Sequence, residues 1–388
     1  MNQLANQERI YFKGIDGLRA IGALTVVFGH IELTKSDFSI PNLLHIPFYK
    51  YTSGHLGVVL FFVLSGFLIT YLLLEEKDKF KTISIKRFYF RRILRIWPIY
   101  YLILFLLLFL FPNIISLPYS AKPNLSNFSE SYPTLMIFFL MAPNLMPFGI
   151  PGIVGGFHLS SIGTEEQFYL FWPWLIKWFK NIMIPLLFIF VFIAIAPNFC
   201  DYLLSHFFLK GSLEYVFIED LRLFFQLFKI DCMALGGIFA YIYFNKKTKL
   251  LNFFFNKYVQ IIALFFGFGF WIIGIRVHFF KDEFYGIFFA IIILNTAVNP
   301  KKLISFDYKW LNYIGKISYG IYVYHWIIIL FVLNFTIHMK DNSVLFNTVF
   351  YSASLGLTLL VSHFSFFKFE SYFLKFKDKF ALIKSNKI

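Results

Sequence analysis

Long apolar stretches recur along the whole chain, and they constrain its fold more than any other feature. A helix needs roughly 20 apolar residues to cross about 30 Å of hydrocarbon. Ten stretches meet this length or nearly so, at about residues 15–34, 55–74, 96–117, 159–180, 182–198, 222–244, 258–276, 284–299, 312–335 and 344–367. The sequence therefore predicts an all-α protein, a polytopic bundle of about ten transmembrane helices.

One further apolar stretch, at 132–146, is shorter and is bracketed by Pro133, Pro143 and Pro147. We interpret it as re-entrant or interfacial, because broken backbone inside a membrane is tolerated only where protein or water satisfies it. If it spans instead, the count becomes eleven. Composition agrees with a membrane fold, since 59% of the residues are hydrophobic and only 15% are charged, against about half and one quarter in soluble domains.

Basic residues stand in short clusters between the apolar stretches. The net charge of +15 is therefore assigned to cytoplasmic loops that meet anionic lipid headgroups, and not to nucleic-acid binding. With the N-terminus inside, the cytoplasmic segments carry 27 of the 36 Lys and Arg residues, the outer segments carry eight, and Lys229 lies within a span. Residues 75–95 contribute most. The positive-inside rule thus predicts that both termini are cytoplasmic.

The remaining features predict a single membrane domain over residues 1–388, with its core at 14–373 and no soluble C-terminal domain. Cys200 and Cys232 give neither a disulfide framework nor a metal-binding spacing, so we expect no metal. No small-residue cleavage site follows the first apolar stretch, and residues 15–33 are therefore interpreted as a retained span and not a signal peptide.

Ionisable residues inside membrane spans are costly, so each is a candidate site residue. Arg19 and His30 are eleven residues apart in the first stretch, which places them on one helix face with roughly 16 Å between them along the axis. The arginine could hold an anion near the cytoplasm while the histidine does chemistry deeper in the membrane. A snorkelling arginine and a packed histidine explain the spacing equally well.

Two more clusters follow in the second and third stretches. Ser65 and Gly66 are small, and small residues allow close helix approach, so packing is their default interpretation. Arg92 and Arg95 are three apart and share a face if that segment is helical. Paired guanidinium groups suit a phosphate-bearing ligand, although anchoring to lipid headgroups is the simpler reading.

Polar residues in later stretches complete the set. His158 precedes Glu165 and Glu166, which open an apolar helix and could complement its dipole, or one could orient a histidine. Lys229 and Asp231 are most simply an ion pair or an inward-facing polar pair. In the ninth stretch His325 follows Tyr322 by three residues within an aromatic stripe, a pattern more often found in packing than in catalysis.

Taken in order, these blocks resemble the acyltransferase-3 family of membrane acyltransferases. The matching elements are Asp16-Gly17-Leu18-Arg19 with His30, residues 61–68, Arg92 and Arg95 with Trp97 and Pro98, residues 165–169, residues 318–325, and Phe369-Glu370. Each element alone is weak, but six in the right order are specific. The chain departs from the family pattern at Val59, where the family usually has an acidic residue, at Ser160, where it usually has tryptophan, and at Ile327 and Tyr372, where proline is common. These departures concern acceptor specificity more than the class of reaction.

The resemblance implies O-acyl transfer, most simply of acetyl, from cytoplasmic acyl-CoA to a hydroxyl of a surface glycan or lipid-linked sugar. It assigns His30 as general base, with a covalent acyl-histidine as an open alternative, and Glu165 as the residue that orients or charges it. Buried without a carboxylate partner, His30 would stay neutral and competent as a base. The predicted acyl-CoA ligands are Arg19, Arg92 and Arg95. The candidates for lining the pocket are Asp16, Ser65, His158, Asp231, Tyr322 and His325.

The partners that follow are membrane lipids, acyl-CoA and the acceptor, in a bacterial cytoplasmic membrane, with no nucleic acid and with the oligomeric state left open. A transporter or flippase fits the composition equally well, although no inverted repeat or matched pair of interrupted helices is visible. A catalytically dead relative used as a scaffold is a third possibility. The intact Arg19, His30, Arg92, Arg95 and Glu165 argue against it.

Overall fold

The computed structural model describes residues 10–114, 128–150, 152, 153, 155–275, 277 and 279–383, and within these ranges the protein is built from helices without β-strands. The helices are α1 (Ile15–Asp37), α2 (Ser53–Phe80), α3 (Ile85–Phe105), α4 (Phe111–Ile114), α5 (Phe128–Phe139), α6 (Leu159–Trp178), α7 (Met183–His206), α8 (Leu213–Leu227), α9 (Ile230–Phe244), α10 (Thr248–Phe255), α11 (Lys257–Leu264), α12 (Phe270–Ile273), α13 (Lys281–Val298), α14 (Lys309–Lys316), α15 (Ser318–Thr336), α16 (Ser343–Phe364) and α17 (Ser371–Lys377). Short π-helical turns at Phe48–Thr52, Leu106–Leu110, Phe265–Gly269 and Ser365–Glu370 join or precede several of them.

Each of the ten predicted stretches is mainly helical over its described residues, but fewer than ten helices pass as membrane spans on length and composition. The six that do are Gly54–Phe80, Ile85–Ile114, Met183–His206, Leu213–Phe244, Ser318–Met339 and Ser343–Lys377. Thr248–Phe255 and Lys257–Ile273, bent by 61° at their junction, make a seventh if they form one span. These helices support an integral membrane protein, while the predicted ten crossings and their orientation are not confirmed. The short stretch at 132–146 contains α5, which ends before Pro143.

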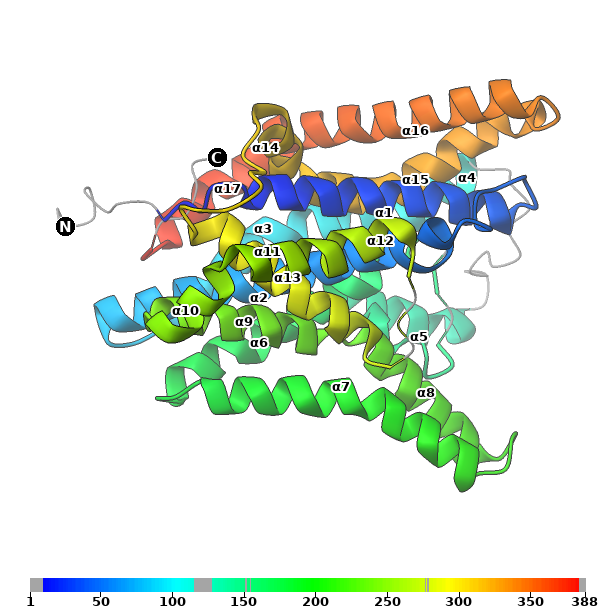
Figure 1. The fold of residues 1–388 in the computed structure, drawn as a ribbon. Coiled ribbons are helices and arrows are strands. Elements are labelled where there is room, and N and C mark those ends of the chain that lie inside the picture. The colour runs from blue at the N-terminus through cyan, green and yellow to red at the C-terminus, as the bar shows by residue number, and fades with distance from the viewer. Residues whose placement is uncertain are drawn as a thin grey trace.

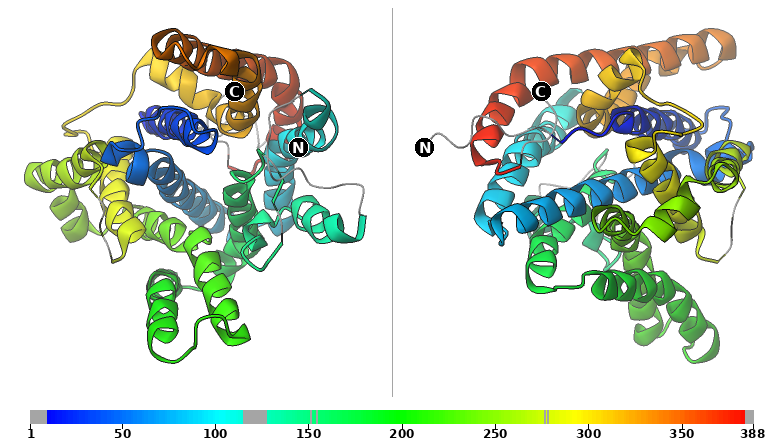
Figure 2. Two further views of the ribbon diagram at one scale, coloured as in Figure 1. Left: turned by 90° about the vertical axis from the view of Figure 1, so that its right-hand side faces the viewer. Right: turned by 60° about the vertical axis from the view of Figure 1, so that its left-hand side comes forward.

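The helices α1 and α2 form the middle of the bundle. Seen end-on they are surrounded by α15 and α16 on one side, α3 and α6 on another, and α9 and α13 on the remaining sides (Figure 2). Glycine allows the closest of these packings, because a Cβ atom on Gly66 of α2 would lie 1.9 Å from the carbonyl oxygen of Met233 on α9. Gly236 of α9 has the reciprocal relation to Val63. The prediction that Gly66 serves helix packing is therefore confirmed.

The helix α7 lies at the edge of the bundle and covers α8 and α9 (Figure 1). Its outer face exposes Ile184, Phe188 and Phe192, each more than half exposed. An exposed apolar face of this kind is an aggregation hazard in water but is favourable against acyl chains. The surface thus agrees with a bundle immersed in lipid.

The start of α1, the α2–α3 connection and α17 lie at one end of the molecule (Figure 1). The helix α17 packs on α3 there, and the backbone carbonyl of Phe380 accepts a hydrogen bond from Arg91 at 2.9 Å. The opposite end holds the connection from α1 to α2 and the turn from α15 to α16. These two ends define the two sides from which the bundle interior is reached.

Candidate functional site

Two cavities lie along the same four helices, one toward each end of the bundle. We call the cavity near the start of α1 the inner cavity and the other the outer cavity. The helices α1, α2, α6 and α15 contribute residues to both cavities, at successive heights along their axes. On α1, Arg19 lines the inner cavity and His30 the outer one, so the roughly 16 Å between them measures the step from one to the other.

The inner cavity, of about 190 Å³, is strongly basic. Its ionisable lining residues are Asp16, Arg19, Glu76, Arg91, Arg92, Arg95, Glu165, Lys316, Glu370 and Lys377. Two of the arginines are engaged by carboxylates, Arg19 with Asp16 at 3.0 Å and Arg91 with Glu76 at 3.2 Å. This lining brings together all three arginines that the sequence assigned to a phosphate-bearing ligand.

Arg92 and Arg95 differ from the other arginines of this cavity. Within the described ranges neither forms an ion pair with a carboxylate, and the Nε atom of Arg92 is buried without a hydrogen-bond partner. The guanidinium group of Arg92 lies over the rings of Phe88 and Tyr169, at 5.4 and 5.2 Å from their centroids. Stacking of this kind holds a planar cation in place and leaves its edge for an anion. The pair is therefore suited to bind a bidentate oxyanion.

Glu165 belongs to this inner cavity and not to the surroundings of His30. Its carboxylate accepts hydrogen bonds from the hydroxyls of Ser65, at 2.8 Å, and Tyr169. The proposed role of Glu165 in orienting His30 is thus not supported by its contacts. Its neighbours instead place it beside the arginine pair, because Tyr169 is also the ring beneath Arg92.

Three further residues of the inner cavity were not singled out as ligands from the sequence. Lys316 ends α14, Tyr319 is the second residue of α15, and Glu370 lies in the π-helical turn after α16. Glu370 carried a signal, since π-helical turns are frequent at functional sites and the Phe369-Glu370 element was part of the family resemblance. Lys316 had no signal, because a basic residue in a short connection is common at membrane surfaces.

The outer cavity, of about 330 Å³, contains the histidines. It is lined by polar residues His30, Tyr49, Lys50, His55, His158, Ser160, Ser161, Gln226, Lys229 and Tyr322, together with apolar and glycine residues such as Gly29, Leu44, Val59 and Phe157. Its mixture of aromatic faces with hydroxyl, amide and imidazole groups suits a polar organic ligand. In the part of the chain that the structure describes, no three His, Cys, Asp or Glu side chains could hold a metal ion.

A hydrogen bond between two imidazole rings fixes the proton on His30. The Nδ1 atom of His325 lies 2.6 Å from the carbonyl oxygen of Tyr322, which can only accept, so this nitrogen carries the proton. In the neutral ring the Nε2 atom of His325 is then an acceptor, and the Nδ1–H of His30 donates to it at 2.7 Å. The Nε2 atom of His30 is consequently left with a free lone pair. Because His30 lines the outer cavity, this arrangement is competent for proton abstraction.

A second layer of contacts holds the two histidines. His158, immediately before α6, donates from Nε2 to the carbonyl oxygen of Val323 at 3.0 Å, and its ring packs edge-on against His325. The hydroxyl of Tyr322 donates to the carbonyl oxygen of His158 at 3.0 Å and lies 2.5 Å from the hydroxyl of Ser161. The predicted pocket residues His158, Tyr322 and His325 are thus brought together around His30. His158 and Tyr322 line the outer cavity, whereas His325 lies behind His30 and lines neither cavity.

A buried ion pair forms the far wall of the outer cavity. Lys229, at the break between α8 and α9, pairs with Asp282 of α13, whose other oxygen lies 2.5 Å from the Nε2 atom of His55 on α2. Lys229 therefore pairs with Asp282 and not with Asp231, while both Lys229 and Asp231 are buried, as the alternative of an inward-facing polar pair expects. Asp231 is 1% exposed and is absent from the lining of both cavities, which does not support its prediction as a pocket residue.

The departures from the family pattern fall partly on this outer cavity. Val59 of α2 and Ser160 of α6 both line it. A valine in place of a carboxylate and a serine in place of an indole change the polarity and the width of the cavity on the side that holds His30. The other two departures, Ile327 and Tyr372, line neither cavity.

Comparison with known proteins shows which family the chain is similar to. Residues 12–364 match the acyltransferase-3 family, which is described as an acyltransferase domain. The chain is 27% identical to the peptidoglycan O-acetyltransferase OatA of Listeria monocytogenes, over all of this chain and 61% of that protein. It is 29% identical to the O-acetyltransferase OatA of Staphylococcus aureus, over 83% of this chain and 51% of that protein. The chain thus spans a little over half the length of these relatives. No solved structure is significantly similar to it.

Proposed function

Because the chain belongs to the acyltransferase-3 family, we propose that it is a membrane O-acyltransferase that moves an acyl group, most simply acetyl, from cytoplasmic acyl-CoA to a hydroxyl of an extracytoplasmic glycan. The observation that carries this proposal is the pair of cavities on shared helices. One presents guanidinium groups, and the other presents an imidazole base. A transferase that joins reactants from two sides of a membrane needs both.

The inner cavity is the donor site. The phosphates of coenzyme A are bound by Arg92 and Arg95, with Arg19 and Lys316 adding positive charge at the same opening. This end of the bundle also carries the basic connection 75–95, and the positive-inside rule assigns such a segment to the cytoplasm. The donor and its binding groups are then on the same side of the membrane.

The thioester is carried from one cavity to the other by the pantetheine arm. The arm is long and flexible, and it follows the side of α1 from Arg19 toward His30. The residues that lie between these positions come from α2, α6 and α15, the helices that line both cavities. Ser161 and Tyr322 line the outer cavity with their hydroxyls 2.5 Å apart, and these hydroxyls are the polar groups that we assign to the thioester carbonyl there.

His30 acts as general base in the outer cavity. Its Nε2 atom takes the proton of the acceptor hydroxyl as the oxygen attacks the thioester carbon, and the C–O bond forms while the C–S bond breaks. The proton then passes from His30 to the thiolate of coenzyme A, which leaves as the free thiol. His325 holds His30 in the tautomer that this step requires, since its own Nδ1–H is committed to the carbonyl of Tyr322.

The acceptor enters through the outer cavity. The Listeria relative is named as a peptidoglycan O-acetyltransferase, and a cell-wall or surface glycan is the acceptor class that we infer for this chain. The polar and aromatic lining of the cavity agrees with a sugar, because Tyr49, Phe157 and Tyr322 offer ring faces while Gln226 and Ser160 offer hydrogen bonds. Val59 and Ser160 give this chain its own acceptor preference within the family.

The test is acyl transfer by the purified protein in liposomes. With labelled acetyl-CoA on the arginine-rich side, we expect labelled ester on a glycan fragment supplied on the opposite side. Arg92→Gln should raise the KM for acetyl-CoA and leave the KM for the glycan unchanged. Ser160→Trp should raise the KM for the glycan and leave the KM for acetyl-CoA unchanged. Transport of unmodified glycan or acetyl-CoA without ester formation would overturn the proposal in favour of a transporter.

A further inference from the structure

A buried ion pair lies two residues beyond His30 and takes no part in the proposed chemistry. The carboxylate of Glu32 and the ammonium of Lys35 are 2.8 Å apart on consecutive turns of α1, with their side chains 0% and 2% exposed. Burying two charges is expensive unless additional hydrogen bonds satisfy them. The surroundings of Glu32 supply such bonds from two other segments of the chain.

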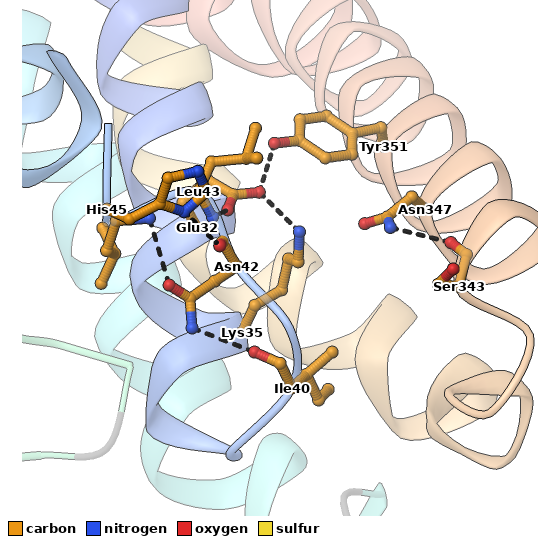
Figure 3. A network of polar contacts seen from close by, with 10 residues as sticks. Glu32, Lys35, Ile40, Asn42, Leu43, His45, Ser343, Asn347 and Tyr351 are labelled. Carbon is orange, nitrogen blue, oxygen red and sulfur yellow. Dashed lines mark hydrogen bonds and ion pairs between the residues drawn. The ribbon is translucent and has the colours of Figure 1, made fainter. Parts of the chain in front are cut away.

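Three donors converge on the Glu32 carboxylate (Figure 3). Its Oε1 atom accepts from Lys35 and from the hydroxyl of Tyr351 on α16. Its Oε2 atom accepts from the backbone N–H of Leu43, in the connection between α1 and α2. The ammonium of Lys35 also lies over the Tyr351 ring, 5.6 Å from its centroid. One carboxylate therefore ties together the core helix α1, the peripheral helix α16 and a connecting segment.

The segment that Glu32 holds forms part of the outer cavity. We call residues 38–52 the outer strap. Leu44, Tyr49 and Lys50 of the outer strap line the same cavity as His30. Around Leu43 the Asn42 side chain accepts from the N–H of Leu44 at 3.1 Å and donates to the carbonyl of Ile40 at 3.0 Å, which are bonds within the strap itself. The strap is tied to α1 by the N–H of Ile40, which donates to the carbonyl of Lys35 at 2.8 Å, and to α16 by a hydrogen bond between Tyr49 and Tyr351.

The position of this cluster relative to the base is set by the helix. Glu32 follows His30 by two residues, so the two side chains leave α1 on different faces. His30 faces the cavity and His325, whereas Glu32 faces α16 and the strap. Of the two segments that Glu32 binds outside α1, the strap is the one that lines the cavity of His30.

We propose that Glu32 is a positioning residue for the acceptor, because it holds the outer strap as one wall of the acceptor cavity. This proposal rests on the proposed function for the meaning of that cavity. The carboxylate acts on the acceptor through Leu43 and the strap residues that follow it. Fully satisfied buried networks of this kind rigidify the elements that they join, so the strap presents Tyr49 and Lys50 to the acceptor in a fixed arrangement.

Glu32→Gln is the variant that separates this role from general stability. Glutamine keeps the size of the side chain but has one acceptor oxygen in place of two. Lys35 is charged and keeps its hydrogen bond to that oxygen. The amide NH₂ then faces the N–H of Leu43, and two donors cannot bond to each other. Loss of a hydrogen bond to a charged acceptor lowers an equilibrium constant about tenfold or more. We therefore expect the KM for the glycan to rise about tenfold, with the KM for acetyl-CoA unchanged.

Two further variants keep the test decisive. Tyr351→Phe removes one donor to Glu32 and the hydrogen bond between Tyr351 and Tyr49 of the strap, but it leaves Leu43 bound to the carboxylate. The KM for the glycan should therefore rise less than it does in Glu32→Gln. Asn42→Ala loosens the strap from within and leaves the Glu32–Lys35 pair intact, and it should raise the same KM as Glu32→Gln does. The Asn42 variant is informative even if Glu32→Gln fails to reach the membrane.

A direct readout of the strap is cysteine labelling. In a background with Cys200→Ala and Cys232→Ala, a Leu44→Cys residue is labelled with a membrane-impermeant maleimide. Glu32→Gln should raise the labelling rate several-fold, and by more than Tyr351→Phe does, because only Glu32→Gln frees Leu43 next to the labelled position. This measurement needs no acyl transfer, so it reads the anchor even if the proposed function fails.

The outcomes divide cleanly. Faster labelling together with a selective rise in the glycan KM supports the proposal. An equal rise of both KM values overturns it. Unchanged labelling also overturns it, as does faster labelling with an unchanged KM for the glycan. If wild-type protein transfers no acyl group to any glycan, the proposed function falls, whereas the labelling result still decides whether Glu32 fixes the strap.

Discussion

Replacing His325 by phenylalanine removes the acceptor for the Nδ1–H of His30 and keeps a planar ring at a position that is 0% exposed. The structure gives the size of the expected effect. The lost bond is 2.7 Å long and partly buried, and an N–H left without a partner away from water costs about 1–3 kcal/mol. Since about 1.4 kcal/mol corresponds to a factor of ten in rate, we expect kcat to fall roughly 10- to 100-fold.

The assay is steady-state transfer of labelled acetyl to a glycan acceptor in proteoliposomes, at saturating acetyl-CoA. The KM for acetyl-CoA should stay within about twofold, because the inner cavity is untouched. His325→Gln, which offers an amide oxygen, should recover part of the rate. Expression and thermal stability of each variant serve as the control for folding.

A double-mutant cycle shows whether His30 and His325 act together or independently. If His325 acts only through His30, the His30→Ala/His325→Phe double variant should be no slower than His30→Ala alone. Multiplicative losses, or wild-type rates for His325→Phe, would refute the argument that His325 sets the tautomer of the base.

Other predictions address the two cavities separately. Arg92→Gln should raise the KM for acetyl-CoA about tenfold or more through loss of a charge-assisted hydrogen bond, measured by kinetics or calorimetric binding, whereas the exposed Arg87→Gln should not. Asp282→Asn leaves Lys229 buried without its carboxylate, so it should destabilise the protein by about 3–5 kcal/mol and lower the melting temperature in detergent. Ser160→Trp places an indole in the outer cavity and should raise the KM for the glycan while acetyl-CoA binding, measured by calorimetry, stays unchanged.

The helices could be predicted from the sequence because lipid-facing and buried positions are both apolar, and length alone then identifies a helix. The small residues of α2 were also readable, since Gly66 meets the backbone of α9. The break at Phe228 and Lys229 could not be predicted. No glycine or proline marks it within the apolar run, and the partner of Lys229 at the break is Asp282, which lies on a different helix.

The part of the candidate site that lies on one helix could be predicted from the sequence. The helical period places Arg19 and His30 on one face of α1, and the structure finds each in a cavity on that helix. The partner of His30 was not readable in this way, because His325 is 295 residues further along the chain. Glu165 was chosen as the orienting residue since a carboxylate is the usual partner of a histidine. Tertiary packing gives that place to a second imidazole and turns Glu165 toward Ser65 and Tyr169.

The most direct test of the account is thioester turnover by the purified protein with acetyl-CoA, read as released thiol, in wild type and His30→Ala. General-base catalysis contributes about 10²- to 10⁴-fold, so thiol release stimulated by a glycan extract should fall by that factor in His30→Ala while acetyl-CoA binding is retained. Undiminished glycan-stimulated release in His30→Ala would contradict the central claim that His30 is the base.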